Sequence, residues 1–322
     1  MCAGAPISGC PALSVPVRPP RGDAVTRTRR VFKDKCARIV TQALSVGASL
    51  LVFLMLLALY QRSRPILALH PLMSLLCSRA WQPLRGLFGF LPFIMGTLWV
   101  TGVAIAIAVP LSLLTAIYLS EYAPRTVREW TSPLIDLLAG IPSVVYGIWG
   151  VLVIVPMIKN HIAPFFGVIS TGYTVLAGGI VLAIMVFPII IHVATEVFRS
   201  VPSEIREASL ALGATKWQTV KHVVMRRSLP GIIAAIGLGV SRAFGETMAV
   251  LMVAGNVAKI PSSVLDPAYP LPALIANNYG EMLSIPLYDS ALLLASLVLL
   301  MVVLLFNLFS RIILMRVEGG MH

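Results

Sequence analysis

The chain has 322 residues, of which 58% are hydrophobic and only 12% are charged. Soluble domains carry about 25% charged residues, so this chain has about half the usual supply for covering a water-exposed surface. The composition therefore excludes a soluble globular enzyme, and the high hydrophobicity excludes a disordered protein. Because the apolar residues are gathered in long blocks, they indicate a polytopic membrane protein.

Long stretches without charge predict the membrane-spanning helices. A helix needs about 20 predominantly apolar residues to cross the hydrocarbon core of a bilayer. Only the fifth such stretch carries charged residues well inside it, namely Arg242 and Glu246. The pattern predicts an all-α protein with six transmembrane helices, at about residues 39–60, 90–120, 133–158, 171–194, 230–256 and 290–309.

The distribution of basic residues predicts the orientation, because Lys and Arg near helix ends stay in the cytoplasm. With the N-terminus inside, 18 of the 25 basic residues lie in cytoplasmic segments and 6 lie on the opposite side, while Arg242 is within the membrane. Both termini are therefore expected in the cytoplasm. Residues 1–38 contribute +6 of the net charge of +12. We interpret them as a disordered basic cytoplasmic tail attracted to anionic membrane lipid, rather than as a nucleic-acid-binding segment.

Motifs of catalysis are missing from the sequence. It contains no G-x-x-x-x-G-K-[ST] phosphate loop, no H-E-x-x-H zinc motif, no G-x-S-x-G nucleophile turn and no C-x-x-C pair. We therefore expect no catalytic site, no metal site and no cofactor on this chain. If ATP drives its function, the ATPase must be another polypeptide.

The segment between the fourth and fifth spans, residues 198–229, predicts two short helices outside the membrane. Ser203 is the expected N-cap of the first helix, with Glu204 and Glu207 in its first turn, where the helix dipole favours acids. Gly213 is expected to end this helix with a positive φ angle. Thr215 and Gln218 have the spacing of a capping box for the second helix.

The predicted helices of this loop are amphipathic. Three interpretations fit them: a linker that lies on the inner leaflet, a DNA-binding helix-turn-helix, and a helix that docks in the groove of a cytoplasmic partner. The two membrane spans that flank the loop argue against DNA binding. The apolar faces consist of Ile205, Ala208 and Leu212 on the first helix, and of Trp217, Val220 and Val224 on the second.

The run Glu207–Gly213 resembles the E-A-A-x-x-x-G signature of permease subunits of bacterial ABC importers. Within that family the chain most resembles the PstC-type permeases of phosphate importers, over about residues 90–310. One departure is that Met225-Arg226 stands where a Leu-Pro usually follows the second loop helix, so the end of that helix is undefined. The further stretches that carry the resemblance are SEYAPR (120–125), LLAGIPSVVYGIWG (137–150), VFPIII (186–191) and SRAFGETMAVLMVAGN (241–256).

The resemblance implies the fold of a type I ABC importer permease in the bacterial inner membrane. It implies a PstA-type second permease, two copies of a cytoplasmic ATPase subunit and an extracytoplasmic phosphate-binding protein as partners. It also implies that the loop at residues 203–224 docks on the ATPase and transmits its closure to the spans. The expected docking residues are Glu207, Ala208, Leu212, Gly213 and Trp217.

The charged residues of the fifth span lead to two interpretations. Arg242 and Glu246 are four residues apart, which on a continuous helix places them on one face. A charge at the bilayer centre costs about 3 kcal/mol or more, so it needs a partner or a water-filled path. The two residues either form a self-contained ion pair, or Arg242 lines an anion path while Glu246 holds it in place. Ser143, Tyr146 and Thr247 are further candidates for the lining of that path.

The resemblance to phosphate permeases favours the anion path and predicts a permease subunit that forms half of the route for inorganic phosphate. The alternatives are a permease for another oxyanion, such as sulfate or molybdate, and a stand-alone ion-coupled transporter. The predicted docking loop argues against the stand-alone transporter, which needs no ATPase.

Overall fold

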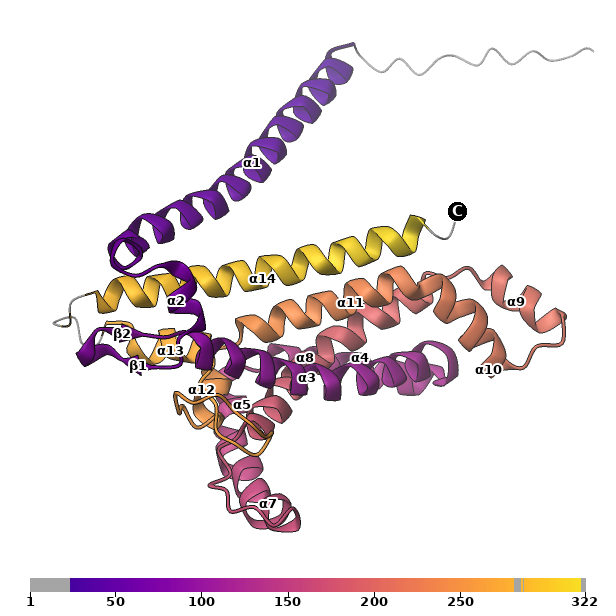
Figure 1. Cartoon of the computed structure of the whole chain (residues 1–322). Helices are drawn as coiled ribbons and strands as arrows, with labels where there is room; N and C mark the ends of the chain where they lie inside the picture. The colour runs from indigo at the N-terminus through magenta and orange to yellow at the C-terminus, as the bar shows by residue number, and fades with distance from the viewer. Residues whose placement is uncertain (1–23, 281–284, 286, 320–322) are drawn as a thin grey trace, which may run out of the picture. The chain divides into compact units, whose positions relative to one another are not determined.

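The computed structural model describes residues 24–280, 285 and 287–319 (Figure 1). The chain consists of two compact units, Met1–Leu56 and Leu57–His322. Helix α1, Ala24–Leu69, runs from the first unit into the second. The expectation of a disordered tail up to residue 38 is therefore wrong for residues 24–38, while residues 1–23 lie outside the described residues. Arg, Lys and Ala are good helix formers, so they extend the helix that the apolar span nucleates.

The second unit is almost entirely helical. A short antiparallel hairpin, β1 (Trp81–Gln82) with β2 (Leu87–Phe88), precedes its long helices. The α-helices are α2 Leu72–Cys77, α3 Leu91–Ile117, α4 Arg125–Gly140, α5 Ser143–Trp149, α6 Val155–Met157, α7 Ala163–Phe165, α8 Val175–Arg199, α9 Ser203–Ala211, α10 Lys216–Thr219, α11 Met225–Gly245, α12 Met248–Val253, α13 Leu271–Asn278 and α14 Tyr288–Gly319. Segments of π-helix are η2 Tyr118–Tyr122, η3 Gly150–Ile154, η4 Ile158–Ile162 and η5 Val220–Val224.

Six helices within the described residues are long and apolar enough to cross a membrane, which confirms the predicted number of spans. Their bounds are Lys33–Leu69, Leu91–Tyr122, Ser143–Phe165, Val175–Arg199, Lys216–Gly245 and Tyr288–Arg316.

The third span begins ten residues later than the stretch predicted at 133–158. Helix α4 ends at Gly140, and Ile141 and Pro142 are extended, with ψ angles of 130° and 140°. Proline disfavours a helical conformation in the residue before it, which explains the break at Ile141. The stretch predicted at 133–158 therefore contains the end of one helix and the start of another, and the membrane-length helix is Ser143–Phe165.

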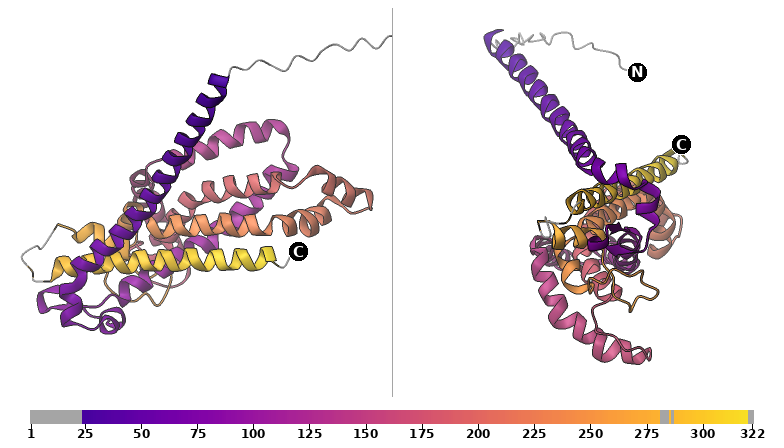
Figure 2. Two further views of the ribbon diagram at one scale, coloured as in Figure 1. Left: turned by 90° about the horizontal axis from the view of Figure 1, so that it is seen from above. Right: turned by 60° about the vertical axis from the view of Figure 1, so that its left-hand side comes forward.

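Helix α8 is the central helix of the second unit. It packs along α3 and along α11, and the three run side by side in Figures 1 and 2. In its most apolar window 67% of the residues are buried, against 39% or fewer in the other five candidate spans. Helices approach closely in a membrane where small residues face each other. A Cβ atom on Gly179 of α8 would lie only 2.8 Å from Cβ of Val103 on α3.

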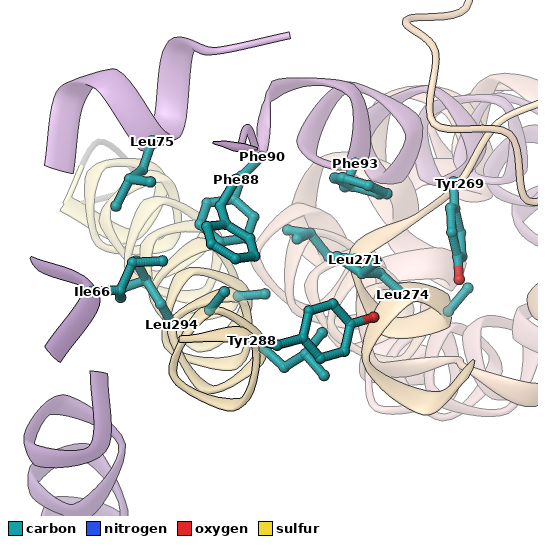
Figure 3. Packing of buried hydrophobic residues seen from close by; sticks show 14 residues of the cluster. Ile66, Leu75, Phe88, Phe90, Phe93, Tyr269, Leu271, Leu274, Tyr288 and Leu294 are labelled. Atoms are coloured by element: carbon teal, nitrogen blue, oxygen red, sulfur yellow. The ribbon is translucent and has the colours of Figure 1, made fainter. Parts of the chain in front are cut away.

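One end of the second unit is closed by an aromatic cluster, which Figure 3 shows between the ribbons of α3, α13 and α14. The ring centroid of Trp81 lies 5.0 Å from that of Phe93 and 5.7 Å from that of Phe88, both in edge-on geometry. Phe93 in turn meets Tyr269 at 5.3 Å. Such pairs add stabilisation beyond the area that they bury. The cluster therefore fixes the hairpin and α13 on the ends of α3 and α14.

The close contact of α3 with α8 leads to a first prediction. Gly179→Leu should lower the midpoint of thermal unfolding of the detergent-solubilised chain by about 5 °C or more, because overpacking costs about 1–3 kcal/mol and Val103 is branched at the contact. Gly102→Leu is the matched control, since Gly102 is an exposed glycine of α3 with open space around it. Equal midpoints for the two variants would contradict this account of the interface.

Candidate functional site

The fifth span is interrupted at the residues that the sequence singled out. Helix α11 ends at Gly245, Glu246 is extended with φ −75° and ψ 125°, and α12 begins at Met248. The expectation that Arg242 and Glu246 lie on one face of a continuous helix is therefore wrong. The four-residue spacing suggested one turn, but the chain leaves the helix between the two residues, directly after a glycine.

Glu246 and Thr247 satisfy backbone groups at this break. One carboxylate oxygen of Glu246 accepts a hydrogen bond from the Ala249 N–H at 3.3 Å, and the Thr247 hydroxyl donates to the Gly245 carbonyl at 3.3 Å. The first donors of a helix and the last acceptors of the helix before it lack partners within the helices themselves. Glu246 therefore stabilises the start of α12 rather than pairing with Arg242.

Arg242 lies in the last turn of α11, where the helix dipole favours a cation. Its side chain is exposed, and none of the ion pairs among the described residues includes it. Leu238 and Ala234, one and two turns earlier on α11, are exposed on the same stripe. A guanidinium with free donors thus stands on an otherwise apolar face, next to an unwound piece of backbone.

Helix α5 carries the other two predicted path residues to this region, because α5 packs on α12. A Cβ atom on Gly147 of α5 would lie 3.2 Å from the Ala249 Cα, so the two backbones nearly touch. Ser143 is half-buried in the first turn of α5. Tyr146 is buried, and its hydroxyl donates to the Leu138 carbonyl at 2.8 Å. This hydrogen bond therefore gives a partner to a carbonyl in the last turn of α4, at the break between α4 and α5.

A loop that sequence reasoning did not single out holds the start of α8. The carbonyls of Val264 and Asp266 accept the N–H groups of Leu176 and Val175 at 2.8 and 2.9 Å. The Thr174 hydroxyl accepts from the Ala177 N–H. The Asp266 carboxylate accepts from the Ser262 N–H and hydroxyl and from the Ser263 N–H, at 2.7 to 3.0 Å. The Ser-Ser-x-x-Asp spacing is a turn signal that could have located this loop.

The cytoplasmic-loop prediction is largely confirmed in its local structure. Gly213 has a φ angle of +84°, and Thr215 with Gln218 forms the expected capping box. The expected N-cap is wrong by one residue, because Pro202 occupies that position and Ser203 begins α9. The second loop helix has no end before the membrane, since residues 216–245 form one helix through α10, η5 and α11.

The residues predicted to dock on a partner form an exposed surface. Leu212 is 89% exposed and Trp217 is 51% exposed, and Glu207, Ala208 and Gly213 are exposed as well. Val220 and Val224, expected on the same face as Trp217, are instead buried. Apolar side chains this exposed on a short helical pair are typical of a docking surface. The loop therefore has an inner half packed on the spans and an outer half available to a partner.

Comparison with known proteins places the chain among transport proteins. Residues 108–321 match the family model for the inner membrane component of binding-protein-dependent transport systems. The chain is 39% identical over 259 residues to the phosphate transport system permease protein PstC of Xylella fastidiosa, which covers 76% of this chain and 79% of that protein. It is 34% identical over 242 residues to the probable PstC of Methanocaldococcus jannaschii, covering 72% and 76%.

Solved structures establish the fold. The alginate ABC transporter in complex with an alginate-bound periplasmic protein matches with a TM-score of 0.54 at 15% identity, covering 87% of this chain and 96% of that chain. The inward-facing MetNI methionine ABC transporter matches with a TM-score of 0.53 at 20% identity, covering 69% and 93%. The predicted permease fold is therefore confirmed.

The loop at Asp266 leads to a prediction about pH. The hydrogen bonds from Ser262 hold the pKa of the Asp266 carboxyl below its ordinary value. A carboxyl whose pKa is lowered by folding stabilises the protein above its ordinary pKa of about 3.9, and that stability is lost as the pH falls through the lowered pKa. Asp266→Asn should therefore lower the unfolding midpoint by about 2–4 °C at pH 7. The difference from wild type should shrink towards pH 3, and a constant difference would contradict the assignment.

Proposed function

Because the chain belongs to the family of inner membrane components of binding-protein-dependent transport systems, we propose that it is the permease subunit of an ATP-driven phosphate importer. It forms one half of the transmembrane path for inorganic phosphate. The similarity to PstC proteins over three quarters of the chain supports phosphate as the substrate. ATP hydrolysis takes place on separate ATPase subunits.

The observation that carries this proposal is the exposed guanidinium of Arg242 on a membrane-length helix, in no ion pair of the described part of the chain. An unpaired charge facing lipid costs several kcal/mol, so this face of α11 must meet water or another subunit rather than hydrocarbon. The planar guanidinium offers a fork of donors that matches phosphate oxygens, and its positive charge offsets the desolvation of the anion. Arg242 therefore contacts phosphate on the face where the second permease joins.

Glu246 supports this site without cancelling the charge of Arg242. Since its carboxylate accepts from the Ala249 N–H, it fixes the start of α12 beside the path. A nearby acid also keeps the site from holding the anion too tightly for release. Ser143 and Thr247 line the same region from α5 and from the break, and Tyr146 keeps α5 in position.

The complete transporter contains a PstA-type second permease, two ATPase subunits and an extracytoplasmic phosphate-binding protein. The exposed surface around Leu212 and Trp217 supports docking of the loop helix in a groove of an ATPase subunit. The excess of Lys and Arg on this side supports cytoplasmic termini. ATP binding favours an outward-open permease and hydrolysis resets it, so that the substrate path alternates between the two sides.

Arg242 is tested by neutralisation. Arg242→Gln should reduce phosphate uptake by proteoliposomes that hold the full complex by about 100-fold or more, because Gln keeps hydrogen bonding and loses the charge. The double variant Arg242→Gln with Glu246→Gln removes both charges and should stay equally inactive. Near wild-type uptake by the double variant, per amount of complex, would contradict an anion path. Sulfate or molybdate that abolishes phosphate uptake at equal concentration would point to another oxyanion as the substrate.

Gly213 is tested by two substitutions that differ in their tolerance of positive φ. Gly213→Val should weaken binding of the ATPase subunit by roughly 5–30-fold, because a β-branched residue in the left-handed region costs about 1–2 kcal/mol. Gly213→Asn should bind almost normally, since Asn accepts this conformation. The surroundings are open, with no atom within 4 Å of an added Cβ, so backbone conformation rather than a clash decides the outcome. Co-purification of the ATPase with each variant measures this, and equal losses would contradict the assignment.

A further inference from the structure

Arg206, on the inner side of the docking helix α9, forms hydrogen bonds to three other residues of the described part of this region. Its guanidinium donates to the Phe198 carbonyl in the last turn of α8, at 2.6 Å, and to the carbonyl of Val201, just after that helix. It also donates to a carboxylate oxygen of Glu121 at 2.9 Å. Arg206 thus satisfies carbonyls that a helix end leaves without partners, and it binds an acid from a third element.

Glu121 belongs to the π-helical segment η2, which ends the long helix α3, and lies 85 residues before Arg206. The side chains are 9% exposed for Glu121 and 22% exposed for Arg206. The pair is therefore largely shielded from water, which keeps it strong and fixed. The neighbouring pair Arg125–Glu129 differs, because its side chains are 92% and 60% exposed and such surface pairs contribute little.

The segment η2 is also held by two other basic residues. Arg128 of α4 donates to the Leu119 and Ser120 carbonyls, both at 3.0 Å. The ammonium of Lys216, in α10, lies 4.7 Å from the centroid of the Tyr122 ring, a cation–π contact. Since π-helical turns are weak points of a helix, a movement of the loop helices that contact η2 can shift the end of α3.

Polar contacts are what join α9 to the membrane helices, because no residue of α9 is buried. Besides Arg206, the Ser209 hydroxyl meets the Thr219 hydroxyl at 3.0 Å and joins α9 to α10. A helix without a buried apolar face cannot transmit force by packing alone. Besides the backbone links at its two ends, these side chains are therefore the contacts that carry its movement to α3 and α10.

We infer that the Glu121–Arg206 pair is the link that transmits movement of the docking helix to α3 and, through η2 and Arg128, to α4. Both are positioning residues, since neither touches phosphate or ATP. The inference rests on the proposed function as an ATP-driven permease. It assigns the SEYAPR stretch a role in coupling the docking helix to the membrane helices, and Glu121 is the residue of that stretch that makes the contact.

The test uses Glu121→Ala in the complete transporter, reconstituted in proteoliposomes with the phosphate-binding protein. Arg206 keeps its bonds to Phe198 and Val201 in this variant, so α9 stays attached to α8 while α3 is released. The ATPase subunit should co-purify at the wild-type amount. Stimulation of ATP hydrolysis by phosphate-loaded binding protein, and phosphate uptake, should each fall at least fivefold. Glu129→Ala is the matched control, since it removes an acid from an exposed pair on the same side, and both values should stay unchanged.

Two results would overturn the inference. Uptake and stimulation within twofold of wild type in Glu121→Ala would show that the pair transmits nothing, and loss of the ATPase subunit would show that the pair is merely structural. If the wild-type complex itself fails to import phosphate, that result contradicts the proposed function, and it is thereby distinguished from a failure of the Glu121–Arg206 link alone.

A cross-link provides the second measurement. In a chain whose native cysteines are replaced by alanine, Glu121→Cys with Arg206→Cys should be uncoupled, here with loss of the Arg206 bonds to Phe198 and Val201 as well. Joining the two thiols with a short bifunctional methanethiosulfonate should restore stimulation and uptake to at least half of the wild-type values. A joined pair that remains uncoupled would overturn the role of this link.

Discussion

Hydrocarbon offers no hydrogen-bond partners, and this constraint applies at three breaks and starts of the long apolar helices in the described part of the chain. At the break after α11, Glu246 accepts the Ala249 N–H. At the break after α4, the Tyr146 hydroxyl donates to the Leu138 carbonyl. At the start of α8, the carbonyls of Val264 and Asp266 receive the first N–H groups. Because backbone groups at each of these three places find partners within the chain, unwound backbone can exist there without destabilising the bundle.

Arg206 and Arg242 show how burial separates structural from functional charge. Arg206 lies on α9, before the long fifth helix, and Arg242 lies in the last turn of α11. Arg206 is held by Glu121 and by two carbonyls through its two terminal nitrogens, while its buried Nε has no partner among the described residues. Arg242 has no such partner among the described residues and stands exposed on an apolar face. A charge that the fold leaves unsatisfied is available to a ligand, whereas a satisfied charge fixes geometry. The same type of side chain therefore holds elements together at Arg206, and under the proposed function it recognises the anion at Arg242.

Composition and local turn chemistry were enough to predict the number of spans, Gly213 at positive φ, and the capping box of Thr215 and Gln218. These features depend on a few neighbouring residues, or on the length of an apolar block. The breaks at Ile141 and Glu246 were missed because hydropathy does not distinguish one long apolar helix from two shorter apolar helices that follow each other along the chain. Arg206 with Glu121 was missed for another reason: the partners lie 85 residues apart, so only the packing of α3 against α8 brings them together.

The helix of residues 216–245 runs from the capping box at Thr215 to the break at Glu246, with the π-helical segment η5 near its loop end. Thirty residues of helix make a rod of about 45 Å, which is longer than the hydrocarbon core is thick. Such a rod acts as a lever: if it tilts by about 10° around one end, the other end moves through an arc of about 8 Å. A change of angle at the loop end of this helix would therefore move the region of Arg242 by several ångström, with no helix having to unfold.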